Sequence, residues 1–140
     1  MMSMMTTMFT VRKGAKVPSA DHRPPWLIIE PENRLALLIE NILSRLGWSI
    51  VRPAENIEKA VPIARELELG GAVIDLDAPD KLIYPVAQAL ANRGIPFVFI
   101  TALSRPLVRE DFRDRPVLAK RFLMEKLRPL IRGVSASAYT

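Results

Sequence analysis

Apolar positions follow two patterns after Trp26: short continuous apolar runs, and amphipathic stretches between them. The runs predict buried strands, whereas apolar residues three and four positions apart predict helices. Strands are predicted at 26–30, 48–52, 72–76, 95–101 and 117–119, and helices at 33–46, 57–67, 82–93 and 122–131. This alternation predicts an α/β domain with a doubly wound, five-stranded parallel sheet between helices on both faces.

Local signals mark where some of these helices begin and end. Asn33 and Asn56 are candidate caps for the first two helices. Gly47 stands where the first helix is expected to end. Pro62 would delete a hydrogen bond inside the second helix. That helix is therefore expected either to start late or to be kinked.

The two ends of the chain lack the pattern. Residues 1–25 have no apolar periodicity and contain Pro18, Pro24 and Pro25, so we expect a disordered N-terminal arm. Residues 133–140 are expected to form a flexible tail. One domain then covers 26–132, an ordinary size for a folded unit. Within it, residues 102–115 are polar and arginine-rich and have only a weak helical pattern.

Polar side chains stand where four of the predicted strands end. Glu30, Asp75, Thr101 and Lys120 each follow a different strand. The carboxyl ends of parallel strands share one rim of the sheet, where the ligand crevice of such folds lies. Carboxylates bind Mg²⁺ through their oxygens, and a carboxylate can attack a phosphoryl group to form an acyl phosphate. A hydroxyl and an ammonium would neutralise the transferred oxygens.

In this order the four groups resemble the receiver domain of two-component response regulators. The resemblance covers roughly 26–132 and is carried by LIIEPEN, AVIDLDAP, YPVAQALANRGIPFVFITA and VLAKRF. It implies a flavodoxin-like fold of the receiver type and a signalling module rather than an enzyme. A histidine kinase or a phosphotransfer protein would donate the phosphoryl group. Because no effector domain follows residue 132, we expect a stand-alone receiver that signals through a protein partner.

The resemblance also assigns a role to each residue of the rim. Asp75 takes the position of the phosphoacceptor. Glu30, Asp75 and the backbone carbonyl of Asp77 would hold Mg²⁺. Thr101 and Lys120 would contact the phosphoryl group. Alternatives without a role in metal or phosphate binding remain open, because Glu30 could instead pair with Lys120, and Asp77 could be a surface acid.

Three positions depart from the family pattern. Pro31 replaces the second of two adjacent acids, so Mg²⁺ binding is expected to be weak or lost unless Glu32 bends back to replace it. Arg121 replaces a proline that often follows a cis peptide bond. A cis bond before any other residue costs about 2.5–4 kcal/mol, so we expect a trans bond and a reshaped turn. Val117 occupies the position of an aromatic switch residue.

Composition narrows the remaining classes. The chain has no cysteine and a single histidine, so disulfides, thiolate metal sites and histidine clusters are excluded, and a cytoplasmic protein is expected. No apolar segment reaches the ~18 residues of a membrane helix. The net charge is +5, and residues 105–140 carry nine bases against four acids. No aromatic or glycine motif is interleaved with these bases, which favours a solvated helix face over a nucleic-acid site.

Two hypotheses for the function of the chain remain open. In the first, the chain accepts a phosphoryl group on Asp75 in a phosphorelay. In the second, supported by Pro31 and Arg121, it is a pseudo-receiver that binds a partner, or a second copy of itself, without phosphorylation. A flavodoxin-like enzyme or nucleotide binder would need a glycine-rich turn after the first strand, and residues 30–33 contain no glycine.

Overall fold

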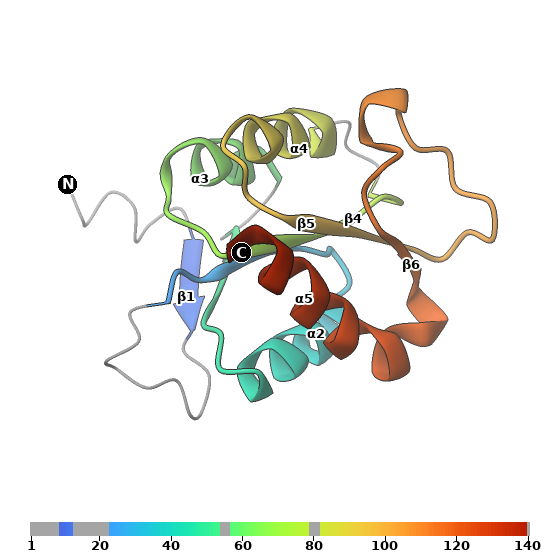
Figure 1. Ribbon diagram of the computed structural model, residues 1–140, viewed down its shortest axis with the longest axis horizontal. Helices are drawn as coiled ribbons and strands as arrows, with labels where there is room; N and C mark the ends of the chain where they lie inside the picture. The colour runs from blue at the N-terminus through green and yellow to red at the C-terminus, as the bar shows by residue number, and fades with distance from the viewer. Residues whose placement is uncertain (1–8, 13–22, 54–56, 79–81, 140) are drawn as a thin grey trace.

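A six-stranded sheet in the order β1-β3-β2-β4-β5-β6 runs through the middle of the molecule (Figure 1). The computed structural model describes the chain except residues 1–8, 13–22, 54–56, 79–81 and 140. The strands are β1 (Phe9–Arg12), β2 (Trp26–Ile29), β3 (Ile50–Pro53), β4 (Gly71–Asp75), β5 (Phe97–Thr101) and β6 (Val117–Ala119). The α-helices are α2 (Asn33–Arg45), α3 (Ala60–Glu66), α4 (Ile83–Asn92) and α5 (Leu123–Tyr139).

Strands β2 to β6 pair in parallel, which confirms the predicted five-stranded doubly wound sheet. Their order is β3-β2-β4-β5-β6, so the direction of winding reverses between β2 and β4. A ligand crevice is expected outside the carboxyl ends of the strands on either side of such a reversal. The fold therefore directs attention to the residues that follow Ile29 and end β4.

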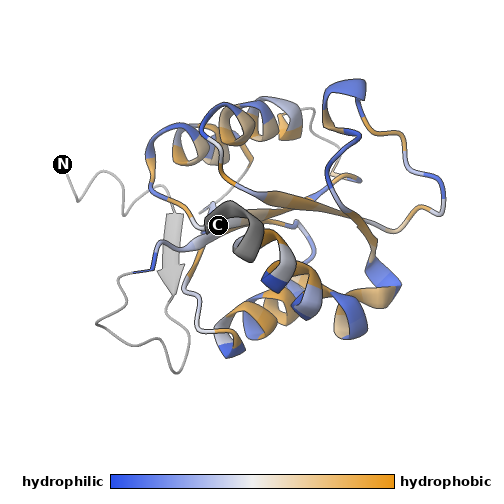
Figure 2. Ribbon diagram, viewed as in Figure 1, coloured by the Kyte–Doolittle hydropathy of each residue, from blue (hydrophilic) through white to orange (hydrophobic). Residues whose placement is uncertain are grey.

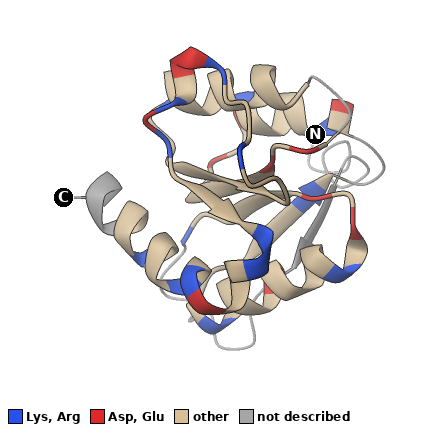
Figure 3. Ribbon diagram, turned by 90° about the vertical axis from the view of Figure 1, so that its right-hand side faces the viewer, with Lys and Arg blue, Asp and Glu red and all other residues tan. Residues whose placement is uncertain are grey.

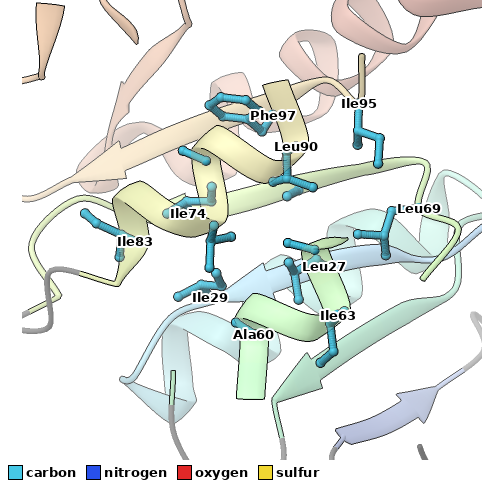
Figure 4. Close-up of a cluster of buried hydrophobic side chains, with 14 of the residues drawn as sticks. Leu27, Ile29, Ala60, Ile63, Leu69, Ile74, Ile83, Leu90, Ile95 and Phe97 are labelled. Atoms are coloured by element: carbon cyan, nitrogen blue, oxygen red, sulfur yellow. The ribbon is translucent and has the colours of Figure 1, made fainter. Parts of the chain in front are cut away.

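Helices α3 and α4 cover one face of the sheet, and α2 and α5 cover the other (Figure 1). The strands and the inward sides of the helices are apolar, while the outward sides are polar (Figure 2). On the first face, Leu27, Ile74 and Leu90 belong to one buried cluster, which is drawn in Figure 4. Burial on both sides explains why the central strands read as continuous apolar runs in the sequence.

Within the expected N-terminal arm, the structure describes one strand, β1. Residues 9–12 pair in antiparallel fashion with residues 50–53 of β3. Backbone hydrogen bonds supply this pairing, and β3 would otherwise be an open edge of the sheet. A four-residue edge strand is too short to show in a periodicity search.

At the other end of the chain, where the sequence analysis expected a flexible tail, α5 continues through 133–139. Leu127 and Ile131 are buried, and Leu130 and Val134 pack against the same cluster. This apolar stripe extends the packed face of the helix past residue 132. Gly133 lies inside this helix.

The helix starts differ in detail from the sequence prediction. Glu32, not Asn33, is the cap residue of α2, and its side chain makes no capping hydrogen bond. Asn56 lies outside the described residues. Of the two alternatives predicted for the second helix, a late start or a kink, the structure shows the late start. A 3-10 turn at Ile57–Lys59 precedes α3, which places Pro62 in the first turn of the α-helix. There, the missing N–H costs no intrahelical hydrogen bond.

The connection between β5 and β6 contains no α-helix, only a 3-10 turn, η2, at Glu110–Phe112. Phe112 is nevertheless 2% exposed. Its ring lies 6.0 Å from that of Phe97 and 6.2 Å from that of Tyr84, centroid to centroid. One buried aromatic ring thus covers the sheet where the predicted helical pattern was weak.

Among the described residues no helix is long and apolar enough to cross a membrane.

Gly71 starts β4 where there is no room for a side chain. A β-carbon built there would lie 2.5 Å from the ring of Trp26, which is fully buried. We expect Gly71→Ala to lower the free energy of unfolding by about 1–3 kcal/mol through overpacking, as measured by urea denaturation. Gly133→Ala is the matched control, since a β-carbon there meets no atom within 4 Å. It should leave stability unchanged or raise it by up to about 1 kcal/mol, and equal effects of the two variants would contradict the packing argument.

Candidate functional site

Glu30 follows β2, whose four residues are all buried. Its side chain is 1% exposed and faces the carboxyl ends of the neighbouring strands. The backbone N–H of Glu32 donates a hydrogen bond of 2.8 Å to Glu30 Oε2. The other oxygen, Oε1, is buried and accepts no hydrogen bond, although it lies 3.3 Å from Lys120 Nζ. A buried carboxylate oxygen that attracts a cation without accepting a hydrogen bond has capacity for a further ligand.

Asp75 ends β4, whose five residues are all buried, and is itself 2% exposed. Its Oδ1 accepts a hydrogen bond of 2.9 Å from the backbone N–H of Asp77, which fixes the carboxylate against the turn after the strand. Its Oδ2 accepts one of 3.1 Å from Lys120 Nζ. The apolar run AVI thus ends in a buried, oriented carboxylate at the winding reversal.

Lys120 stands between three carboxylates. It follows β6 and begins the 3-10 turn η3 (Lys120–Phe122). Besides Asp75 and Glu30, it approaches Asp77 Oδ2 at 3.7 Å. Figure 3 views the sheet from this end and shows acidic segments after the strands and a basic segment where β6 passes into η3. One ammonium therefore offsets the charge of an otherwise acidic rim.

Thr101 contacts Asp77 and not Asp75. Its hydroxyl donates a hydrogen bond of 2.6 Å to Asp77 Oδ1, and the backbone N–H of Ala102 donates one of 2.6 Å to Asp77 Oδ2. The Thr101 hydroxyl oxygen in turn accepts 3.0 Å from the N–H of Leu103. The sequence analysis assigned Asp77 only a backbone carbonyl and did not identify the Ala102 amide. An acid two residues beyond the strand-end aspartate was the available signal for this contact.

Burial and neighbouring charges shift the pKa values of three of these groups. Burial raises the pKa of Glu30 above its ordinary value, and the charge of Asp75 raises it further. The hydrogen bond from the Glu32 amide and the charge of Lys120 lower this pKa but do not outweigh the burial. Burial alone would raise the pKa of Asp77, but hydrogen bonds from Ala102 and Thr101 and the charge of Lys120 outweigh it, so that pKa is lowered. Burial alone would lower the pKa of Lys120, but Asp75 and then Glu30 outweigh it, so that pKa is raised.

The raised pKa of Glu30 predicts a pH effect on stability in chelator-treated protein. Between the unfolded value of 4.5 and the higher folded value, the native state binds more protons than the unfolded state. The Glu30 contribution to the free energy of unfolding therefore grows as the pH falls through the folded pKa, and levels off below 4.5. We expect the stability of the wild type, minus that of Glu30→Gln, to increase over this window in urea denaturation. A difference that decreases as the pH falls would contradict the burial of a charged Glu30.

The oxygen atoms here fit a hard cation with an incomplete shell of protein ligands. Glu30 and Asp75 supply carboxylates, and Glu30 Oε1 is the buried oxygen without a hydrogen-bond donor. Within the described part of the chain, no group of three or more Asp, Glu or His residues is arranged to hold a metal ion. Mg²⁺ requires no such cage, since one or two carboxylates and several waters suffice. The residues present therefore fit Mg²⁺, with fewer negative ligands than the family pattern provides.

The positions that depart from the family pattern supply nothing to this cluster. The side chain of Pro31 has no ligand atom, and in the described structure no hydrogen bond or ion pair joins the exposed Glu32 carboxylate to the cluster. No described peptide bond is cis, as expected for a turn with Arg121 after the lysine. The guanidinium of Arg121 lies 4.7 Å from the Phe122 ring centroid, outside the cluster. Val117 is 38% exposed on the edge strand.

Comparison with known proteins finds relatives of this chain among the solved structures. No protein-family model and no curated protein sequence matches the chain. Among solved structures, the chain is similar to SdrG from Sphingomonas melonis Fr1, with 32% identity and a TM-score of 0.66 over 84% of this chain and 98% of SdrG. SdrG has also been solved in a BeF3-activated conformation, which matches at 33% identity and a TM-score of 0.64 over 79% of this chain and 95% of that one.

A more distant structure shares the fold. The receiver domain of the sensor histidine kinase PA1611 from Pseudomonas aeruginosa PAO1 was solved with a magnesium ion in its active-site cleft. It matches at 20% identity and a TM-score of 0.63, over 81% of this chain and 98% of that one. At 20% identity, this match supports the fold alone.

Proposed function

The chain belongs to the receiver domains of two-component response regulators, and we propose that it accepts a phosphoryl group on Asp75 within a phosphorelay. The observation that carries this proposal is the environment of the Asp75 carboxylate. It is buried at the end of β4, held by the Asp77 amide at 2.9 Å and contacted by Lys120 at 3.1 Å. The solved BeF3-activated form of SdrG supports the proposal, because beryllofluoride resembles a phosphoryl group in shape and charge.

The transfer is a displacement at phosphorus. A lone pair on an oxygen of the Asp75 carboxylate forms the new P–O bond. The bond between phosphorus and the donor breaks, and its electron pair leaves with the donor, which is a histidine nitrogen of a kinase or phosphotransfer protein, or the acetate of acetyl phosphate. A histidine nitrogen takes up one proton from solvent as it leaves, whereas with acetyl phosphate the charges balance without any proton transfer. Lys120 is placed to neutralise charge on the transferred oxygens, because its ammonium already contacts Asp75.

Mg²⁺ would be held by Glu30, Asp75 and the backbone carbonyl of Asp77, and when bound it neutralises charge on the phosphoryl oxygens. The magnesium ion in the PA1611 receiver supports the choice of Mg²⁺ as the ion. We propose that the affinity for Mg²⁺ is weak, because Pro31 supplies no carboxylate. Output is proposed to pass to a protein partner, with the protein acting in the cytoplasm.

Intact-mass spectrometry after incubation with acetyl phosphate and Mg²⁺ tests the proposal. We expect the wild type to gain the mass of one phosphoryl group and Asp75→Asn to gain none. Asp114→Asn is the matched control, since its carboxylate is 78% exposed and the residue precedes β6, at the opposite end of that strand from Lys120. It should be phosphorylated like the wild type. A wild type without a mass shift at saturating acetyl phosphate and Mg²⁺ would contradict phosphorylation.

Pro31 favours a second candidate function, a pseudo-receiver that associates with a partner or with itself independently of phosphorylation. Light scattering coupled to size exclusion distinguishes the two for self-association. A dimer that persists in Asp75→Ala and in chelator would support the second function. A dimer that forms only with acetyl phosphate and Mg²⁺ would support the first.

A further inference from the structure

The carboxylate of Asp77 already occupies the groups that a phosphoryl group on Asp75 would need. Its two oxygens accept hydrogen bonds of 2.6 Å from the Thr101 hydroxyl and from the Ala102 N–H. Its Oδ2 also lies 3.7 Å from Lys120 Nζ. A hydroxyl, a backbone amide and an ammonium are the kinds of group that hold transferred phosphoryl oxygens. Here they hold a carboxylate from the same chain.

These donors cannot serve two anions at once. The Thr101 hydroxyl and the Ala102 N–H each carry a single hydrogen, and both are directed at Asp77. The Asp77 side chain is 23% exposed, against 3% for Asp75, so it has access to solvent if its contacts break. The negative charge of Asp77 also repels an incoming phosphate dianion. Phosphorylation of Asp75 therefore requires the Asp77 carboxylate to leave.

We propose that Asp77 is an internal substitute for the phosphoryl group, which holds Thr101 and the Ala102 amide in the unphosphorylated protein and slows phosphorylation of Asp75. The inference rests on the proposed function, which it extends by a regulatory role for one side chain. Asp77 is a positioning residue in this account, acting through Thr101 and Ala102. Its backbone carbonyl, the proposed Mg²⁺ ligand, is unaffected by replacement of the side chain.

The test compares rates of phosphorylation by acetyl phosphate in Mg²⁺, followed by intact mass, for the wild type, Asp77→Ala and Asp77→Asn. We expect Asp77→Ala to react about tenfold faster than the wild type. Asp77→Asn should be intermediate, because an amide keeps one acceptor oxygen but loses the charge. Asp114→Asn, which removes one exposed carboxylate, should react at the wild-type rate.

A second measurement follows the contact itself in unphosphorylated protein. The Ala102 amide proton resonance should move upfield in Asp77→Ala and less in Asp77→Asn, because a short hydrogen bond to a charged oxygen is lost or weakened. A purely structural effect of the substitution would not grade with the acceptor in this way. This measurement also shows whether each variant is folded.

The outcomes separate the inference from the proposed function. Faster reaction of Asp77→Ala than of the wild type supports the inference. Equal rates for the wild type and both variants overturn it and leave phosphorylation of Asp75 standing. An unmoved Ala102 resonance overturns it as well. If neither the wild type nor any Asp77 variant is phosphorylated, the proposed function fails, and the inference fails with it.

Discussion

Lys120→Met is expected to lower the free energy of unfolding at pH 7 by about 3 kcal/mol. The Lys120 ammonium lies within 3.3 Å of oxygens of Asp75 and Glu30, both nearly fully buried, and 3.7 Å from Asp77. Methionine keeps most of the length of the side chain but removes the only cation among these contacts. The remaining carboxylates then repel one another in a site from which water is largely excluded. Urea denaturation of the two proteins in chelator measures the difference.

Two further variants locate the cause of this loss. Arg128→Met removes one positive charge from an exposed position on α5 and should change stability by no more than about 0.5 kcal/mol. Glu30→Gln should recover part of the loss when combined with Lys120→Met, since it removes one of the repelling charges. If Lys120→Met is as stable as the wild type, or if Glu30→Gln brings no recovery, the lysine does not hold the carboxylates together.

Pro31→Asp is expected to tighten Mg²⁺ binding by about tenfold or more, which corresponds to at least ~1.4 kcal/mol. Residue 31 follows Glu30, whose Oε1 is buried and accepts no hydrogen bond. A carboxylate there would supply the negative ligand that proline lacks and restore the acidic pair typical of the family. Isothermal titration with MgCl₂ gives the dissociation constants directly.

The control for this substitution is Pro31→Ala, because replacing proline also frees the backbone before α2. Alanine relaxes the backbone in the same way without adding a charge. If Pro31→Ala tightens Mg²⁺ binding as much as Pro31→Asp does, the conformation of the turn and not the missing carboxylate limits the site. An unchanged affinity in both variants would mean that residue 31 lies away from the ion.

The sequence predicted most of the fold because the central strands are covered on both faces. Their apolar runs, such as AVI before Asp75 and PFVFI before Thr101, identify strands without ambiguity. The elements that were missed are stabilised by long-range contacts. β1 depends on the open edge of β3. The last two turns of α5 depend on contacts of Leu130 and Val134 with the core. Neither contact leaves a periodic signal in a short segment.

The candidate site was predicted in its membership but not in its internal contacts. Strand order alone brings Glu30, Asp75, Thr101 and Lys120 to one rim, so their positions followed from the predicted topology. Which partner each side chain chooses depends on distances of a few ångströms that spacing cannot supply. The hydrogen bond from the Thr101 hydroxyl to Asp77 is such a contact, and the sequence analysis did not predict it.

Reductive trapping tests the central claim most directly. Protein phosphorylated by acetyl phosphate is treated with borohydride, which reduces an aspartyl phosphate to homoserine, and the peptide covering 72–78 is sequenced by mass spectrometry. The account predicts homoserine at position 75 and intact aspartate at position 77. Homoserine at position 77, or an unreduced peptide from protein that carries the phosphoryl mass, would show that Asp75 is not the acceptor.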